Sequence, residues 1–348
     1  MKHSFAREHR DLIIIILSFG FSLVLGGVFI ALYGADPLAA YASMIRGALG
    51  DGDAVLVTLA RAVPIVLATM SIAVAFNGGM WNIGAEGQLF LGAFAAAWVG
   101  IDLGFLPGPL LTVLGLALGM GAAMFWAWMP ARLSLDKGLN IVVLTIMCNS
   151  IAILFTTWLA TGPYAGARAN SGTTDRIAEA MRLPHFHAFG TLNWGIFIAA
   201  AAVLLVALWM IASVAGYEWR CCRMNATFAG YAGIDARSRK MQVMMASAAL
   251  AGLAGALLVV GDHYRFLTTL SPGYTWTGMI LAMMTADRPV AGIAAALIYA
   301  VMSSGALEME LATDIPTELV SVIVCCAVLF VTAGVAVADR LANRIRED

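Results

Sequence analysis

Residues 76–90 read FNGGMWNIGAEGQLF, a run that combines four glycines, two asparagines, a glutamine and a carboxylate. Each glycine lowers helix propensity by roughly 1 kcal/mol relative to alanine, so the run predicts an interrupted helix. A carboxylate near a bilayer centre costs about 2.5–3.5 kcal/mol, so Glu86 is expected to face protein and to have a partner. Irregular backbone at membrane depth needs protein or a water-filled cavity around it, which favours a broken helix lining a pathway. The alternative is a short turn at the membrane surface that caps two helices and meets lipid headgroups.

The whole chain has the composition of an integral membrane protein. Its 348 residues are 61 % hydrophobic and 12 % charged, with a mean hydropathy of +0.87, whereas soluble domains are about 25 % charged. No long polar block interrupts the apolar runs, so residues 1–348 are interpreted as a single transmembrane domain without a soluble catalytic module. A net charge of −1 gives no indication of a nucleic-acid partner.

Apolar runs of about 20 residues predict an all-α polytopic fold of about ten transmembrane helices, some of them broken or re-entrant. The predicted spans are 12–34, 55–76, 80–101, 109–130, 139–161, 192–214, 241–261, 274–286, 289–307 and 315–338.

Basic residues predict the orientation of these spans. With a cytoplasmic N-terminus, the basic regions 131–138 and 215–240 and the basic C-terminal tail fall on one side, and the acidic loop 308–314 falls on the other. This is the distribution that the positive-inside rule requires. The exception is 162–191, which is assigned outside although it contains three arginines, but long loops weigh less in the rule. Both termini are therefore predicted to be cytoplasmic.

A second irregular segment, SPGYTWTGMILAMMTADRP at 271–289, contains a span too short to cross a membrane alone. It occupies a position in the second half of the chain similar to that of 76–90 in the first, as in transporters built from repeats. Asn149, in the middle of a predicted span, either bonds across helices or contacts a ligand. Arg61 is interpreted as snorkelling to the interface or as a partner for Glu86.

The stretch 216–240 is the only long basic segment, and a positive-inside anchor would explain its charges. That interpretation leaves NATFAGYAGID, residues 225–235, unexplained. This small-residue run predicts a short surface helix that ends at Gly233, of the kind that docks into a groove on another protein.

Several chemical motifs are missing from the sequence. It has no G-x-x-x-x-G-K-[ST] phosphate loop, no H-E-x-x-H and no Cys/His metal spacing, and its five cysteines are expected to be free thiols. It offers no convincing nucleophile or acid pair for an intramembrane enzyme.

Four segments together resemble permease subunits of ABC importers, in the branch that carries nucleosides and simple sugars and is related to ribose and branched-chain amino-acid permeases. They are FNGGMWNIGAEGQLFLGAFAAAWVG, LTIMCNSIA, GYEWRCCRMNATFAGYAGID and SPGYTWTGMILAMMTADRPVAGIAAALIYAVMSSGA, in the family's order between about residues 76 and 305. The sequence departs from the family pattern at WRCCRMN before Asn225, at GMILAMMT, and at Ile141, where members often have an acid. These departures bear on the substrate more than on the fold.

The resemblance implies a chain that performs no chemistry itself and binds no cofactor, with ATP and Mg on partner subunits. The implied partners are a second permease, identical or homologous, two ATPase subunits and an extracytoplasmic solute-binding protein, in a bacterial inner membrane. The residues predicted to form the substrate path are Phe76, Asn77, Trp81, Asn82, Glu86, Gln88, Asn149 and Trp276. Those predicted to couple to the ATPase are Glu218, Arg220, Asn225, Ala229, Gly230, Gly233 and Ile234.

The resemblance of NIGAEGQ to its branch of the family favours nucleosides as solutes, and the aromatic residues Phe76, Trp81, Tyr274 and Trp276 could stack on a base. A free base, a riboflavin-like compound and a sugar stay open as alternatives. The alternative function is an ion-coupled secondary transporter that works alone. Loss of an ATPase partner would leave its uptake unchanged.

Overall fold

The computed structural model describes residues 17, 20–166, 172–186, 191–285, 289–313, 315–319, 321–323, 325–326 and 330. Nearly all of the regular structure in these residues is helical, and the extended pairing among them consists of two isolated bridges, Thr173 with Leu267 and His185 with Asn193. The predicted all-α polytopic fold is confirmed.

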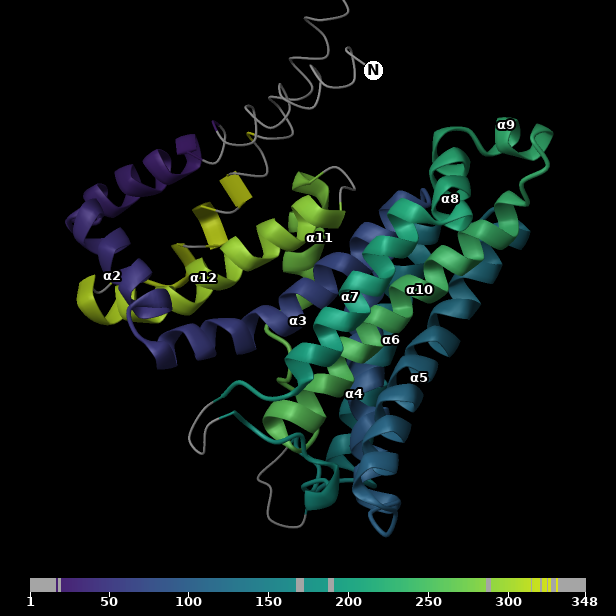
Figure 1. Cartoon of the computed structure of the whole chain (residues 1–348), viewed down its shortest axis with the longest axis horizontal. Helices are drawn as coiled ribbons and strands as arrows, with labels where there is room; N and C mark the ends of the chain where they lie inside the picture. The colour runs from purple at the N-terminus through teal and green to yellow at the C-terminus, as the bar shows by residue number, and fades with distance from the viewer. Residues whose placement is uncertain are drawn as a thin grey trace, which may run out of the picture. The chain divides into compact units, whose positions relative to one another are not determined.

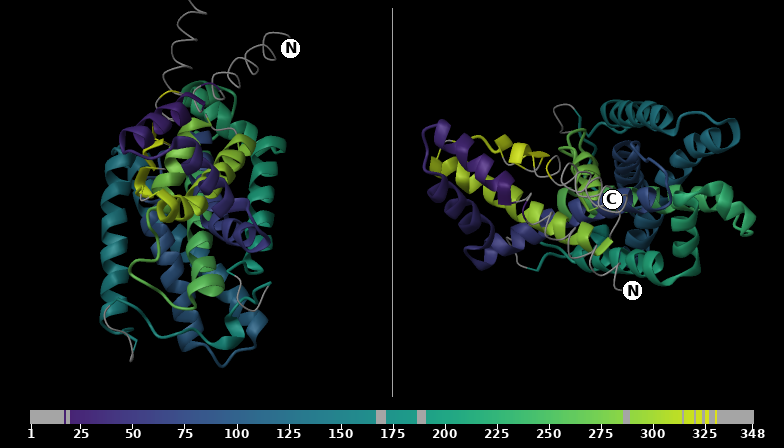
Figure 2. Two further views of the ribbon diagram at one scale, coloured as in Figure 1. Left: turned by 90° about the vertical axis from the view of Figure 1, so that its left-hand side faces the viewer. Right: turned by 90° about the horizontal axis from the view of Figure 1, so that it is seen from above.

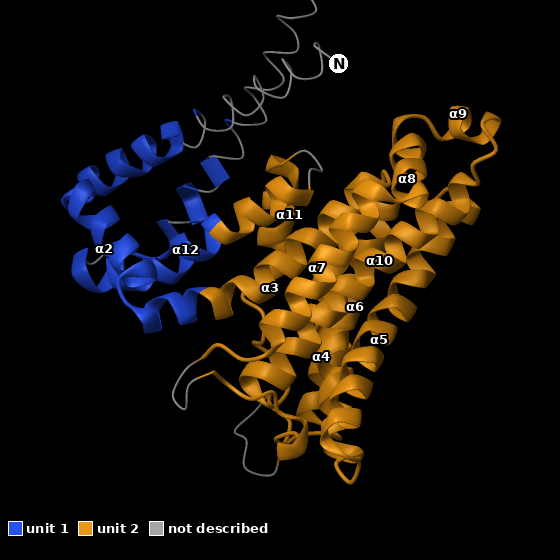
Figure 3. Ribbon diagram, in the orientation of Figure 1, with its two compact units in different colours: residues 1–58, 298–348 blue, residues 59–297 orange. Residues whose placement is uncertain are grey.

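The chain forms two compact units, one from residues 1–58 with 298–348 and the other from 59–297 (Figure 3). Two helices, α3 (Gly52–Asn77) and α12 (Pro289–Thr313), contribute residues to both units. The interpretation as a single transmembrane domain stays a prediction. We call residues 59–297 the bundle unit, because they contain the helices that position the candidate site.

The unit made from the two chain ends contains a sharply bent helix pair. A helix over Gly20–Leu32 is followed by α2 (Pro37–Leu49), and the two axes differ by 114°. Asp36 caps α2 by accepting from the Leu38 N–H at 2.9 Å, and Pro37 occupies the first helical turn. The apolar runs predicted no helix at 37–49, so α2 is an unpredicted element. Part of the predicted span 12–34 and most of 315–338 lie outside the described residues.

Three helices form the centre of the bundle unit, and Figure 1 shows them side by side. They are α4 (Ala85–Asp102), α5 (Gly108–Lys137) and α10 (Ala236–Leu257). A Cβ atom on Gly92 would lie 2.4 Å from the Gly252 carbonyl oxygen, and one on Gly119 would lie 2.9 Å from the Gly92 carbonyl oxygen. The three backbones therefore touch directly, because glycine alone leaves room for this approach. Around them lie α6 (Ile141–Thr161) and α7 (Gly195–Ala212).

One end of the bundle unit carries α8 (Val214–Met224) and α9 (Ala226–Tyr231), which project from the helices in Figure 1 and in the view from above in Figure 2. Side-chain caps begin three successive helices there: Ser213 for α8, Asn225 for α9 and Asp235 for α10. Such caps end one helix and start the next within a few residues. The C-terminal end of α5 lies at this same end, since Arg237 forms an ion pair with Asp136. The predicted basic regions 131–138 and 215–240 are thus adjacent.

The opposite end is closed by the loop that precedes α7. The Leu183 N–H donates to the Val260 carbonyl at 3.0 Å and the Ile177 N–H to the Tyr264 carbonyl at 2.9 Å. These bonds attach the loop, including a 3-10 turn at Glu179–Met181 (η1), to the π-helical continuation of α10 at Leu258–His263 (η2). Each end of the unit is therefore built by a different set of loops.

Six helices among the described residues are long and apolar enough to cross a membrane, or seven if the bent pair counts as one span. The six correspond to the predicted spans at 55–76, 109–130, 139–161, 192–214, 241–261 and 289–307. Helix α11 (Tyr274–Met284) has 11 residues, about 16 Å at 1.5 Å per residue, so it crosses only part of a bilayer, as predicted. Helix α4 begins at Ala85, later than the predicted 80.

Candidate functional site

Glu86 lies in the first turn of α4, and its side chain is only 4 % exposed. Its Oε2 atom accepts a hydrogen bond from the Thr275 backbone N–H at 3.1 Å and a second, short one from the Thr275 hydroxyl. Thr275 lies in the first turn of α11. One buried carboxylate therefore joins the starts of two interrupted helices.

The position of this carboxylate has a simple electrostatic reason. Free backbone N–H groups give a helix N-terminus a partial positive charge, which stabilises a nearby anion. Glu86 is close to two such ends, its own and that of α11. The predicted partners of Glu86 were the amides freed by the glycines, Asn82, Gln88 or Arg61, whereas the two described hydrogen bonds come from Thr275 in the second irregular segment.

Residues 78–84 form no helix, and two of them contact α10. A Cβ atom on Gly78 would lie 2.3 Å from Val243, and further along the Asn82 amide donates to the Ser247 hydroxyl at 2.9 Å. Asn82 and Gln88 also exchange two amide hydrogen bonds, of 2.8 and 3.0 Å. Asn82, Glu86 and Gln88 are thus surrounded by protein, which disagrees with a turn exposed to headgroups for these three residues, whereas Trp81 in the same segment is exposed.

Asn149, on α6, is the third link to the start of α4. Its Oδ1 atom accepts a short hydrogen bond from the Gly87 backbone N–H, and the side chain is buried. The amide therefore bonds between helices, which was one of its two predicted roles. Contact with a solute stays a prediction.

Three consecutive residues of α4 thus bond to different parts of the unit: Glu86 to α11, Gly87 to α6, and Gln88 to the segment that contacts α10. We call this buried polar group the α4 entry cluster. It consists of Asn82, Glu86, Gly87, Gln88, Asn149, Ser247 and Thr275. Sequence reasoning missed Thr275 and Ser247, which reach the cluster only through the packing of α11 and α10.

The remaining predicted path residues lie outside this cluster. The Phe76 and Trp81 rings are 4.8 Å apart, and Trp81 and Trp276 are 43 % and 44 % exposed. Asn77 is buried, and its Oδ1 atom has no hydrogen-bond partner among the described residues. The structure therefore groups Asn82, Glu86, Gln88 and Asn149, whereas Trp81 and Trp276 face outward.

The predicted coupling region has its own internal contacts. Glu218 forms an ion pair with Arg239 on α10, and Arg220 donates to the Met210 carbonyl near the end of α7. Asn225 caps α9 by accepting from the Phe228 N–H at 2.9 Å. These three side chains hold α8 and α9 in place, so a direct role at a partner surface is not needed to explain them.

Helix α9 ends as the sequence predicted. Gly233 has φ +80°, a left-handed conformation that glycine adopts without strain, and the Ile234 N–H bonds back to the Ala229 carbonyl at 3.0 Å. Ala229 is 1 % exposed, whereas a Cβ atom on Gly230 would meet nothing within 4 Å. Among the predicted coupling residues, Ala229 is therefore buried, whereas Gly230 opens to the surface.

Large apolar side chains on the outer surface of this region were not predicted. Met224, Phe228 and Tyr231 are 87 %, 71 % and 87 % exposed. Three such side chains around one short helix form a surface suited to a protein partner. We call them the α9 apolar surface. A hydrophobic residue within a small-residue run, as Phe228 is, was the available signal.

The described residues contain no group of three or more His, Cys, Asp or Glu side chains placed to hold a metal ion. The five cysteines are free thiols, as predicted.

Comparison with known proteins identifies the family to which this fold and site belong. Residues 54–333 match the family model described as branched-chain amino acid transport system / permease component. A glucose ABC transporter permease of Haloferax volcanii is 30 % identical over 89 % of this chain and 84 % of its own length. A guanosine ABC transporter permease of Bacillus subtilis is 29 % identical over 90 % and 91 %. A nucleoside ABC transporter permease of Lactococcus lactis is 27 % identical over 92 % and 91 %.

Proposed function

Because the chain belongs to the family of branched-chain amino acid transport system permease components, a family of membrane-spanning transport subunits, we propose that it carries nucleosides. Two of the relatives are named for a nucleoside or guanosine, and they match the chain over about nine-tenths of both lengths. The observation that supports a solute path is the α4 entry cluster, where two interrupted helices meet at Glu86. Transporters place their solute sites at such interruptions.

The proposed mechanism is alternating access, driven by ATP binding and hydrolysis on two partner ATPases. In this proposal the chain holds no nucleotide and no cofactor. A second permease, the same or homologous, completes the path, and an extracytoplasmic binding protein delivers the solute. The complex lies in a bacterial inner membrane with both chain termini in the cytoplasm.

The α9 apolar surface is the proposed contact with the ATPase. Its exposed side chains lie on the end of the bundle unit that also carries the basic residues of 131–138 and 215–240. The positive-inside rule supports a cytoplasmic position for that end. An ATPase approaching from the cytoplasm would meet Phe228 and Tyr231 first.

Uptake by cells that carry or lack the chain tests the proposal. Labelled guanosine should accumulate only when the chain is present, and excess unlabelled nucleoside should compete. An inactivating substitution in the partner ATPase should abolish the uptake; unchanged uptake would favour the ion-coupled secondary transporter.

A sugar is the second candidate, because one relative is named for glucose. Labelled glucose in the same cells distinguishes the two solutes. Accumulation of glucose without accumulation of guanosine would overturn the nucleoside proposal.

A further inference from the structure

A groove of about 680 Å³ opens on the outside of the bundle unit, away from the α4 entry cluster. Its floor is a face of α10, and its walls come from α5 and α7. The floor residues Met241, Gln242, Met245, Ala246 and Ala249 are partly exposed, whereas the positions between them on α10 are buried. The groove therefore follows an uncovered strip of α10 along residues 241–249.

The deep part of the groove is apolar. Met124 and Trp128 of α5 and Trp209 of α7 line its walls. The Trp209 ring packs 5.1 Å from that of Trp219, which is fully buried, so this wall is fixed in place. Methionine and tryptophan surfaces of this kind suit a hydrocarbon chain.

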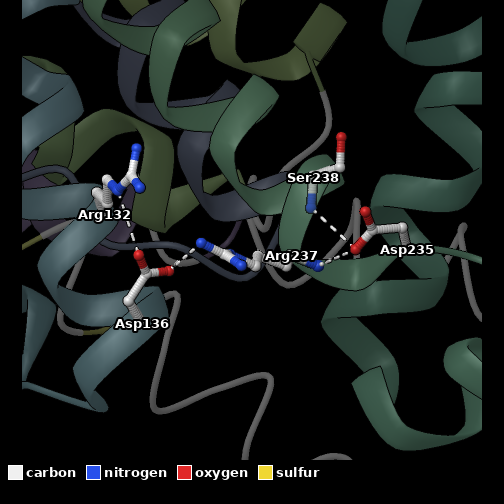
Figure 4. Close-up of polar contacts among 5 residues, drawn as sticks. All are labelled: Arg132, Asp136, Asp235, Arg237 and Ser238. Carbon is white, nitrogen blue, oxygen red and sulfur yellow. Dashed lines mark hydrogen bonds and ion pairs between the residues drawn. The ribbon is translucent and has the colours of Figure 1, made fainter.

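The mouth of the groove is charged, and Figure 4 shows its polar contacts. Arg132 donates from Nε to Asp136 at 3.2 Å, and Arg237 forms an ion pair with the other oxygen of the same carboxylate. Asp235 accepts from the backbone N–H groups of Arg237 and Ser238. The mouth thus offers two guanidinium groups and two carboxylates.

The Arg132 guanidinium has donors that point away from Asp136. Its contact with Asp136 uses Nε, and Figure 4 shows a terminal nitrogen on the side of the guanidinium that faces away from that carboxylate. The guanidinium also lies 5.2 Å from the centre of the Trp128 ring. A planar guanidinium held on an aromatic face presents a fixed fork, which suits the oxygens of a phosphate.

The charges at the mouth and their position along the helices indicate which kind of ligand the groove would bind. Arg132 is near the C-terminal end of α5, and Ser238 is in the first turn of α10, so the mouth lies where the helices end and the apolar groove lies beside their spans. Aromatic and basic side chains at that level meet lipid headgroups. Because two carboxylates offset the two guanidinium groups, the mouth matches a headgroup that carries both signs.

We propose that this groove binds one zwitterionic phospholipid with a phosphate and an ammonium group. The phosphate contacts the Arg132 guanidinium, the ammonium faces Asp235, and an acyl chain lies over Met245 and Ala249. The lipid covers the uncovered strip of α10 and joins α5 to α7. This site does not depend on which solute the protein carries.

Mass spectrometry of lipids retained by the purified full-length chain tests the site, with phosphatidylethanolamine as the probe and phosphatidylglycerol as competitor. Arg132→Gln removes the phosphate contact, and Met245→Trp fills the groove. Both should lower retained phosphatidylethanolamine by about tenfold, the effect of roughly 1.4 kcal/mol. Arg46→Gln on α2 and Val143→Trp on α6 change exposed residues elsewhere and should leave retention unchanged.

Three results would overturn the proposal. Equal phosphatidylethanolamine in all variants would show that the groove holds no specific lipid. Preferential retention of phosphatidylglycerol would contradict the zwitterionic headgroup. A change in oligomeric mass on Met245→Trp, without a change in lipid, would assign the groove to a second copy of the chain.

Discussion

Glu86 and Thr275 are 189 residues apart in the chain, yet the Thr275 backbone N–H and hydroxyl both donate to one oxygen of the Glu86 carboxylate. Both residues are buried, and each lies in the first turn of a helix that begins inside the bundle unit. The contact makes the start of α11 depend on a side chain of α4.

Glu86→Gln is expected to retain assembly and to slow uptake. The amide keeps the size of the side chain and an acceptor oxygen but loses the charge, and hydrogen bonds to a charged group are about twice as strong as neutral ones. Uptake rate per molecule of membrane-inserted protein measures the effect. Thr275→Ser keeps the hydroxyl and serves as the matched control. Wild-type uptake by Glu86→Gln would remove Glu86 from the path.

Asn149→Ala is expected to destabilise the protein by about 1–3 kcal/mol, because the buried Gly87 N–H would lose its acceptor. Asn149→Asp keeps an acceptor oxygen and tests whether the bond alone matters. Thermal unfolding in detergent gives the stability, and uptake by folded protein gives the function. A large loss of uptake without a loss of stability would favour direct contact with the solute.

Gly230→Trp is expected to leave the chain stable in the membrane but to prevent co-purification of the ATPase. Position 230 opens onto free space beside the α9 apolar surface, so an added ring would block an approaching partner. Ala229→Trp is not an equivalent probe, since Ala229 is buried and the ring would disrupt α9 itself. Phe228→Ala tests the same surface without added bulk. If Gly230→Trp still co-purifies with the ATPase and supports normal stimulated hydrolysis, α9 does not dock there.

Glu218→Arg and Arg239→Glu are each expected to loosen α8 from α10, because each leaves two like charges in contact. The double exchange should recover about 1 kcal/mol relative to the sum of the single changes. Thermal unfolding of the four proteins completes the cycle. Additive losses would show that the pair contributes no coupling.

Gly92→Ala is expected to cost about 1–3 kcal/mol, because the new methyl group would overlap the Gly252 carbonyl. Gly121→Ala on α5 is the matched control: nothing lies within 4 Å of its Cβ position, so it should be neutral or stabilising by up to about 1 kcal/mol. Thermal unfolding distinguishes the two. Equal effects would contradict the close contact of α4 with α10.

The apolar runs predicted the long helices well, because a span is encoded locally by its own hydropathy. Helix α2 was missed because PLAAYASMIRGAL, at 37–49, is too short and too polar for that criterion. The partner of Glu86 could not be predicted either, since Thr275 reaches it only through the packing of α11. Likewise, the sequence placed Glu218 and Arg220 among the residues that couple to the ATPase, but it gave no sign of their contacts with α10 and α7.

The glycine contacts among α4, α5 and α10 restrict how the protein can move. Backbones that touch at Gly92, Gly119 and Gly252 can neither slide nor separate without losing their fit, so we expect these helices to travel as one rigid block. Residues 78–84 and 264–273, which precede α4 and α11, are not part of this block of helices. The first segment leads into α4 and the second into α11, and Glu86 links the starts of these two helices. As long as the contact between Glu86 and Thr275 holds, the start of α11 moves together with this block.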